Sequence, residues 1–207
     1  MSDVIAHYDA LVDEGNDPVR DPAPLREYMD KWDGQTFIDK MELDKNRSAL
    51  EIGVGTGRLA ARVAPLCKRL AGIDISPKTI ERARENLSAY TNISLICADF
   101  MSYEFDESFD VVYSSLTFMH IGDKRTAIEK IASLLSFSGV FALSLDKSQS
   151  EFIDMGTRKI RIFPDDPDAI KKHILASGLC ITEELETEFA NIIISKKISR
   201  PTGPIYG

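Results

Sequence analysis

The chain has 207 residues, of which 43% are hydrophobic, and this is enough for one domain with a single core. Its net charge of −8 lies almost entirely in residues 1–45, which hold 12 acidic and 5 basic residues. Because the sequence has no basic patch, nucleic acids and anionic membranes are poor partner candidates. We expect a cytoplasmic protein, since Met1-Ser-Asp does not start a signal region and no apolar run could span a bilayer.

Residues 1–45 are expected to form a helical cap, with helices near 3–13, from about 24, and after 36. Three apolar or aromatic residues on the second helix, Tyr28, Met29 and Trp32, lie at helical spacing, which is most often the spacing of core residues. Residues 46–198 are expected to be the core of the same globular domain, and residues 199–207 a loosely held tail.

The most informative stretch spans residues 49–58, where an apolar strand enters a glycine-rich turn and then a helix. Gly53, Gly55 and Gly57 remove the Cβ atoms where the backbone passes close to a ligand. The acid Glu51 stands near the end of the strand. This pattern predicts a nucleotide-cofactor site, because the free amides at the start of the following helix point toward the turn.

The glycines alone allow two cofactors. Residues 55–60 satisfy the G-x-G-x-x-G/A pattern of a dinucleotide loop, so an NAD-dependent oxidoreductase is one possibility. Asp74, at the end of the second apolar strand, can accept both hydroxyls of a ribose, but NAD enzymes have an acid there too. Glu51 and the extra glycine at 53 favour a cationic cofactor over a pyrophosphate, which a carboxylate would repel.

Further strands follow at the spacing of alternating strands and helices. The third ends at Asp99-Phe100, the fourth spans 109–115 and continues into Leu116–Ile121, and the fifth spans 140–145. The last two, near 180–187 and 189–196, are close enough to form an antiparallel hairpin. Three scattered cysteines lack metal-ligand spacing, so no metal is expected, and Cys97 should lie in a buried strand.

The E-x-G-x-G-x-G loop, followed by these strands in this order, resembles the class I S-adenosylmethionine (SAM) methyltransferases over roughly residues 46–198. The resemblance implies an α/β, doubly wound and mostly parallel seven-stranded sheet with helices on both faces. Strand 7 would insert antiparallel between strands 5 and 6, whereas a typical NAD fold would keep it parallel. Ligands would bind at the carboxyl ends of the strands.

The resemblance also implies roles for individual residues. The end of the loop at Glu51 would face the ammonium and sulfonium of SAM, although Glu51 can also cap loop amides. Asp74 would hold the ribose, Asp99 the adenine amino group, and Phe100 would pack beside the ring. Tyr8 would reach the SAM carboxylate or else pack on its helix. The expected cofactor residues are Glu51, Gly53, Gly55, Gly57, Asp74, Ile75, Asp99, Phe100, Ser114 and Tyr8.

The acceptor side is less defined by the sequence. His120, just past the fourth strand, could act as a general base or only bond backbone in its loop. Tyr28, Trp32 and Met119 are substrate candidates, with simple packing as the alternative for the two aromatic residues. His7 and His173 are expected at the surface.

The expected function is transfer of the SAM methyl group to a small-molecule acceptor by in-line displacement, which leaves S-adenosylhomocysteine (SAH). The acidic N-terminal segment favours a neutral or cationic acceptor. An NAD-binding oxidoreductase and a non-catalytic SAM-binding module remain alternatives. The chain would be a monomer or a homodimer.

Overall fold

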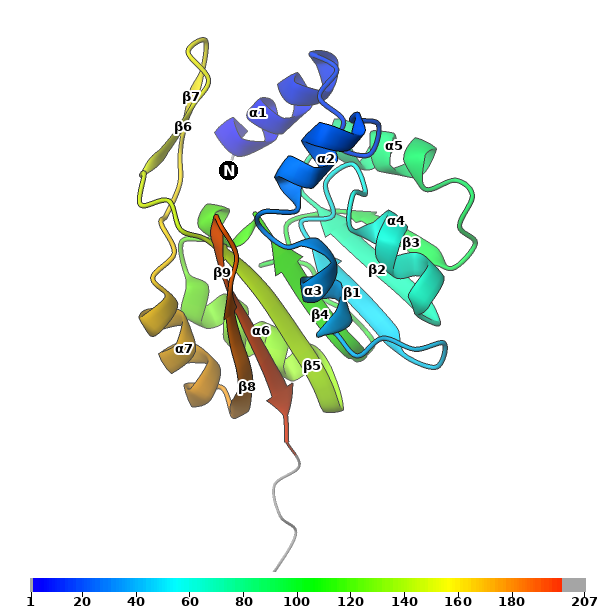
Figure 1. The fold of residues 1–207 in the computed structure, drawn as a ribbon, viewed down its shortest axis with the longest axis vertical. Helices are drawn as coiled ribbons and strands as arrows, with labels where there is room; N and C mark the ends of the chain where they lie inside the picture. The colour runs from blue at the N-terminus through cyan, green and yellow to red at the C-terminus, as the bar shows by residue number, and fades with distance from the viewer. Residues whose placement is uncertain (1, 199–207) are drawn as a thin grey trace, which may run out of the picture.

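A seven-stranded sheet runs through the middle of the molecule, with its strands in the order β3-β2-β1-β4-β5-β9-β8 (Figure 1). The computed structural model describes residues 2–198, so the expectation for the tail 199–207 lies outside the described residues. β1 to β5 are parallel, and β9 lies antiparallel between β5 and β8, as predicted. The strands are β1 (Ser48–Ile52), β2 (Arg69–Asp74), β3 (Ile93–Cys97), β4 (Phe109–Ser115), β5 (Leu135–Asp146), β8 (Leu179–Glu186) and β9 (Ala190–Lys197).

The sheet reverses its order of growth at β1, because β2 and β3 extend to one side and β4 and β5 to the other. At such a switch point the connections leave the two neighbouring strands in opposite directions, which opens a crevice at their carboxyl ends. The loop after β1 and the segment after β4 therefore flank the position where a ligand is expected.

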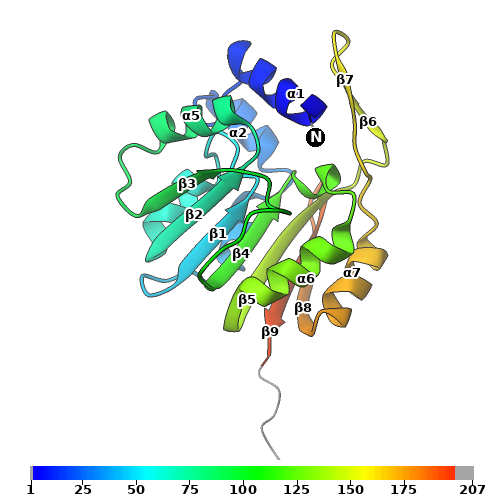
Figure 2. The ribbon, with the colours of Figure 1, turned by 180° about the vertical axis from the view of Figure 1, so that it is seen from behind.

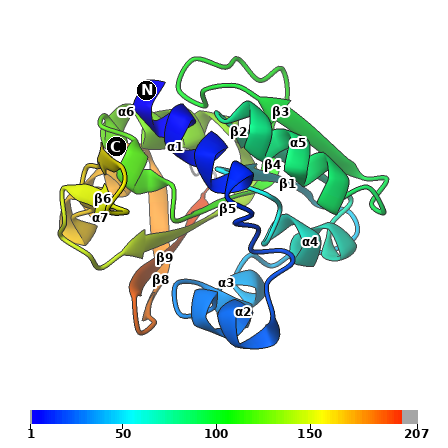
Figure 3. The same ribbon diagram turned by 90° about the horizontal axis from the view of Figure 1, so that it is seen from above.

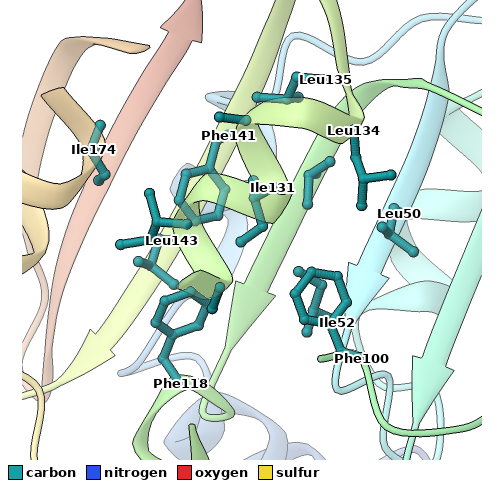
Figure 4. Close-up of a cluster of buried hydrophobic side chains, with 14 of the residues drawn as sticks. Leu50, Ile52, Phe100, Phe118, Ile131, Leu134, Leu135, Phe141, Leu143 and Ile174 are labelled. Carbon is teal, nitrogen blue, oxygen red and sulfur yellow. The ribbon is translucent and has the colours of Figure 1, made fainter. Parts of the chain in front are cut away.

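Helices cover both faces of the sheet (Figure 2). α6 (Lys124–Leu134) and α7 (Pro167–Ala176) pack on one face, and their buried side chains join those of the strands in one apolar cluster (Figure 4). α3 (Gly34–Asp39), α4 (Ala60–Val63) and α5 (Pro77–Asn86) contribute to the cluster on the other face. A 3₁₀ turn, η1 (Ala64–Leu66), follows α4, and a second, η2 (Phe118–His120), precedes α6.

The starts of the main helices follow their capping residues. Ser76, Asp123 and Asp166 each accept a hydrogen bond from a backbone N–H in the first turn of α5, α6 and α7, respectively. Proline occupies the first position of α5 and of α7, where its missing N–H costs nothing. Each of these helices therefore begins next to a side chain that satisfies one of its first backbone N–H groups.

α1 (Ser2–Asp13) lies at the carboxyl end of the strands and crosses above the sheet (Figure 3). α1 is attached to α5 rather than to the sheet, since Asp9 accepts from Ser76 Oγ at 2.6 Å and Asp13 pairs with Lys78. α2 (Ala23–Met29) follows a loop in which Asp17 accepts two bonds from Asn86. Polar contacts thus hold this segment over the crevice.

Two features differ from the expectations. β6 (Phe152–Asp154) and β7 (Lys159–Arg161) form a separate antiparallel hairpin beside α1, which short, weakly patterned strands did not reveal. Cys97 is exposed, so its predicted burial is wrong: it is the last residue of β3, an edge strand with a neighbouring strand on one side only. Between residues 2 and 198, no helix is long and apolar enough to cross a bilayer.

Candidate functional site

The glycine loop lies at the carboxyl end of β1. Gly53, Gly55 and Gly57 have φ angles of 76°, 56° and 101°, which residues with a side chain rarely adopt. A Cβ on Gly53 would lie 1.9 Å from Thr117 Oγ1, and one on Gly57 would lie 2.8 Å from Leu87 Cδ1. A Cβ on Gly55 would meet no protein atom within 4 Å. Gly53 and Gly57 therefore permit close packing inside the protein, and Gly55 is the member of the three with space for a ligand.

Asp74 ends β2 and supports the loop from the neighbouring strand. Its Oδ2 accepts a hydrogen bond from Gly55 N and its Oδ1 one from Ser76 N, both at 3.0 Å. Burial raises its pKa, although these backbone N–H groups act in the opposite direction. Because a carboxylate can accept about four hydrogen bonds, Asp74 has capacity for two further donors, such as the hydroxyls of a ribose.

Glu51 is a buried acid beneath the same loop, with only 4% of its surface exposed. Its register partner on β4 is Tyr113, whose O–H donates to Glu51 Oε2 at 2.8 Å. Burial raises the pKa of Glu51 to about 8, against the lowering effects of Tyr113 and of the Arg58 charge. A cation beside this carboxyl would favour its charged form.

The suggestion that Glu51 caps the loop amides finds no matching contact. The amides of Gly53 and Val54 both donate to the carbonyl of Ile73 on β2. The carboxyl of Glu51 is thus bonded to Tyr113 alone among the described residues. Its predicted role toward a cationic cofactor stays a prediction.

The other expected cofactor residues divide into two pairs. Ile75 and Asp99 are partly exposed after β2 and β3, and Asp99 Oδ1 accepts from Met101 N at 3.0 Å. Phe100 and Ser114 are held in the interior: Phe100 belongs to the core cluster, and Ser114 Oγ donates to Ile52 O at 2.9 Å. Core packing and strand pairing explain these two positions, and their contact with a cofactor stays a prediction.

A buried ion pair that the sequence did not reveal joins the N-terminal segment to the glycine loop. Arg58, directly after Gly57, donates from Nη1 to Asp33 Oδ1 at 3.0 Å. Asp33 also caps α3 through Gly34 N and accepts from Ser115 Oγ at the end of β4. The loop, α3 and β4 therefore meet at one carboxylate, and no local sequence pattern marks such a long-range contact.

Tyr8 and His120 meet above the crevice, although 112 positions separate them. Tyr8 Oη lies 2.7 Å from His120 Nε2. Burial, with the nearby charge of Asp74, raises the pKa of Tyr8, so its phenol keeps the proton. Burial, with His7 and Lys124 nearby, lowers the pKa of His120 to about 4. Both groups are thus uncharged at neutral pH, and the direction of their hydrogen bond depends on the tautomer of His120. His120 Nδ1 is buried with no hydrogen-bond partner among the described residues.

The base role considered for His120 therefore has weak support, because an imidazole with so low a pKa binds a proton poorly. The hydroxyl of Tyr8, which was expected near the cofactor carboxylate, is hydrogen-bonded to His120. Both residues lie where α1 meets the segment after β4, and both roles stay predictions.

The hairpin of β6 and β7 is attached to α1 through Arg158. Arg158 Nε donates to His7 Nδ1 at 3.1 Å, and its guanidinium pairs with Glu14. His7 is buried, with 3% of its surface exposed, so its predicted surface position is wrong. His7 would be exposed to solvent on α1 alone, but the β6–β7 hairpin, far away in the sequence, covers it.

A cavity of about 240 Å³ lies between α1, the hairpin and the ends of β4 and β5. Its lining is apolar apart from Tyr8, Ser148 and two acids, Asp146 and Asp165. The residues that line it are Tyr8, Leu116, Met119, Asp146, Ser148, Phe152, Ile153, Ile162, Pro164 and Asp165. Leu116 has a φ of 56° directly after β4, an unusual backbone conformation for a branched residue and one often found at functional sites.

The three substrate candidates lie at different distances from this cavity. Met119 lines it. Trp32 is connected to it indirectly, since its Nε1 donates to Asp146 Oδ2 at 3.0 Å. Tyr28 is 47% exposed and packs on Trp32 and Phe189, away from the lining residues. Packing against Trp32 and Phe189 is enough to explain the position of Tyr28. Separately, the described part of the chain holds no cluster of ligands for a metal ion.

Comparison with known proteins gives the fold and a family match over less than half of the chain. Residues 50–143 match the family model described as a methyltransferase domain. Nodulation protein S of Sinorhizobium fredii is 33% identical over 104 residues, which cover 48% of each chain. A malonyl-[acyl-carrier protein] O-methyltransferase of Ilyobacter polytropus is 29% identical over 123 residues, or 56% of this chain and 46% of that protein. The matches thus span about half the length of these relatives.

Among solved structures, the N-methyltransferase NodS from Bradyrhizobium japonicum in complex with SAH superposes with a TM-score of 0.69. The alignment covers 95% of this chain and all of that one, at 17% sequence identity. At such low identity the likeness concerns the fold, and it confirms the predicted class I architecture.

Proposed function

We propose that this chain, whose residues 50–143 form a methyltransferase domain with the class I fold, transfers the methyl group of SAM to a small-molecule acceptor. The observation that carries the proposal is the glycine loop between the buried carboxyl group of Glu51 and the partly buried one of Asp74. Gly55 has a positive φ and open space at its Cβ position, and Glu51 and Asp74 lie on the strands that enter and support the loop.

The residues at this loop fit the cofactor. The open side of Gly55 allows close approach of a ligand, because no side chain lies within 4 Å of the missing Cβ. Asp74 retains two acceptor positions for ribose hydroxyls, and Glu51 is a buried acid whose charged form would be favoured by the ammonium of the methionine part. Asp99, after β3, has a free carboxylate oxygen for the adenine amino group.

When bound, SAM supplies a methyl group already activated by its positively charged sulfur. The acceptor forms a bond to the methyl carbon while the carbon–sulfur bond breaks and its electron pair stays on sulfur. The chain's own contribution is alignment and exclusion of water, which can supply up to about 7–11 kcal/mol of barrier lowering in ideal cases. α1 and the β6–β7 hairpin close over the site through Tyr8, His120 and Arg158.

Two alternatives are less well supported. An NAD-dependent oxidoreductase would use the same glycines and Asp74, but it gives no role to a buried acid at Glu51, which would repel a pyrophosphate. A non-catalytic SAM-binding module would share the cofactor site, but it gives no role to a separate cavity at the ends of β4 and β5. The relatives methylate different atoms by name, so they do not select the acceptor atom.

Calorimetric titration with SAH, with NAD as the matched control, tests the cofactor. We expect micromolar binding of SAH and no binding of NAD. Binding of NAD alone would overturn the proposal. Release of SAH from SAM on addition of an acceptor would then separate an enzyme from a binding module. Whether the chain is a monomer or a homodimer, and whether it is cytoplasmic, remain predictions.

A further inference from the structure

The cavity beneath α1 combines an apolar wall with an acidic corner. Seven of its ten lining residues are hydrophobic or proline: Leu116, Met119, Phe152, Ile153, Ile162 and Pro164, together with the ring of Tyr8. The acids Asp146 and Asp165 line the same space. A volume of about 240 Å³ restricts an occupant to a small molecule.

The two carboxylates differ in how their charge is compensated. Asp165, 2% exposed, pairs with Lys124 Nζ at 2.6 Å, so its charge is neutralised within the protein. Among residues 2–198, the donors to Asp146 are neutral: Trp32 Nε1 at 3.0 Å and Ser148 N at 2.6 Å. These two bonds fix the orientation of the Asp146 carboxylate without cancelling its charge. The lining therefore carries one net negative charge, located at the end of β5.

The remaining polar groups near the cavity do not change this balance. His120, bonded to Tyr8, is neutral at physiological pH, and Tyr8 keeps its phenolic proton. Lys124 donates to the carbonyls of Phe118 and Phe163 in addition to pairing with Asp165. An anionic occupant would meet Asp146 with no cation left to offset the repulsion, whereas a cationic one would be attracted.

We propose that this cavity binds the methyl acceptor, and that the acceptor is an amine on a small apolar body, held as its ammonium by Asp146. That the bound amine is a methyl acceptor rests on the proposed function, whereas the shape and the charge of the cavity do not depend on it. The apolar body would lie against Met119, Phe152 and Ile162, and the nitrogen would point toward the ends of β4 and β5.

The proton balance of the transfer follows from this assignment. An ammonium has no lone pair, so it must release one proton before its nitrogen can form the new bond to carbon. Asp146, the carboxylate that holds the ammonium, can accept that proton, since no cation is paired with it among the described residues. The nitrogen lone pair then forms the bond to the methyl carbon, the carbon–sulfur bond breaks, and its electrons remain on sulfur. The product is a methylated ammonium with the same charge as the bound substrate.

The single tryptophan of the chain provides a readout at the site itself. Because Trp32 donates to Asp146, a cation that binds Asp146 should change the Trp32 fluorescence. The experiment titrates the full chain with benzylamine, benzyl alcohol and benzoate, which share a ring and differ in charge. Calorimetry in parallel measures each dissociation constant without relying on fluorescence.

We expect benzylamine to bind at least about tenfold more tightly than benzyl alcohol, since its ammonium adds an ion-pair attraction to Asp146 that a neutral alcohol lacks. Benzoate should not bind. Substitution Asp146→Asn should remove the preference for the amine, while Asp106→Asn, an exposed acid outside the cavity, should leave it unchanged. Equal binding of benzylamine and benzyl alcohol by the unmodified chain, or no binding of benzylamine, would overturn the inference whether or not the variants fold.

An SAH titration of the same preparation separates this inference from the proposed function. If SAH binds and benzylamine does not, the cofactor assignment stands and the amine assignment is wrong. If benzylamine binds at Trp32 and SAH does not, the cavity has its amine preference and the methyltransferase proposal fails.

Discussion

Substitution of alanine at two glycines of the same loop separates packing within the protein from contact with a ligand. At Gly53 the added Cβ would overlap Thr117, whereas at Gly55 it would meet no protein atom within 4 Å. Both residues have positive φ angles, so each alanine costs about 1–2 kcal/mol of backbone strain. Overpacking adds about 1–3 kcal/mol at Gly53. We therefore expect a loss of about 2–5 kcal/mol of unfolding free energy for Gly53→Ala and about 1–2 for Gly55→Ala.

For ligand binding, Gly55→Ala is the informative variant. If SAM or SAH fills the space beside Gly55, the Cβ of Gly55→Ala enters that space and weakens binding. An overpacking cost of about 1–3 kcal/mol corresponds to a loss of roughly fivefold to more than a hundredfold in affinity. The protein should still fold, because no protein atom is displaced.

Urea denaturation of both variants measures the stability change, and calorimetry with SAH measures the affinity at a temperature where both are folded. A folded Gly55→Ala variant that binds SAH as tightly as the unmodified chain would show that no ligand occupies the space beside Gly55. Equal destabilisation of the two variants would contradict the packing analysis of the loop.

Three further predictions concern single side chains around the crevice. Asp74→Ala should weaken SAH binding about a hundredfold or more in a folded variant, as calorimetry would detect, because two charge-assisted hydrogen bonds are lost; an unchanged dissociation constant would refute the ribose assignment. The pKa of Glu51 in the folded protein is about 8, above its ordinary value of 4.5. Between these two pH values the folded protein binds the proton more tightly than the unfolded chain, so the unfolding free energy should fall as pH rises, by up to about 1.4 kcal/mol per pH unit. Glu51→Gln should flatten that slope in denaturation curves recorded at pH 5 to 8, and parallel curves would contradict the assignment. Tyr8→Phe leaves His120 Nε2 without its hydrogen-bond partner and should cost about 1–3 kcal/mol in unfolding experiments, whereas the matched change at exposed Tyr28 should cost little.

Much of the fold follows from local sequence signals. Each of β1, β2 and β4 is a short apolar run bounded by turn residues, and the starts of α5, α6 and α7 have a capping side chain. The acids at the strand ends, Asp74 and Asp99, could be located because parallel strands bring their carboxyl ends to one edge. These signals require no knowledge of distant contacts.

The parts that the sequence did not reveal depend on long-range contacts. The pairing of Asp33 with Arg58, the bond between Tyr8 and His120, and the cover that Arg158 gives His7 each join segments far apart in the chain. Cys97 was misjudged for a related reason, since an apolar strand reads the same whether it lies at the edge or in the centre of a sheet. The role of each glycine was also hidden, because only the structure distinguishes a Cβ that meets Thr117 from one that meets open space.

A crystal structure of the chain with SAH would show whether the glycine loop binds the cofactor. We expect SAH at the carboxyl ends of β1 and β2, with the ribose hydroxyls about 2.5–3.0 Å from Asp74 and the ligand covering the open side of Gly55. It also predicts that the thioether sulfur faces the cavity that contains Met119 and Asp146. Electron density for SAH at another place, or a ribose that does not reach Asp74, would contradict the account.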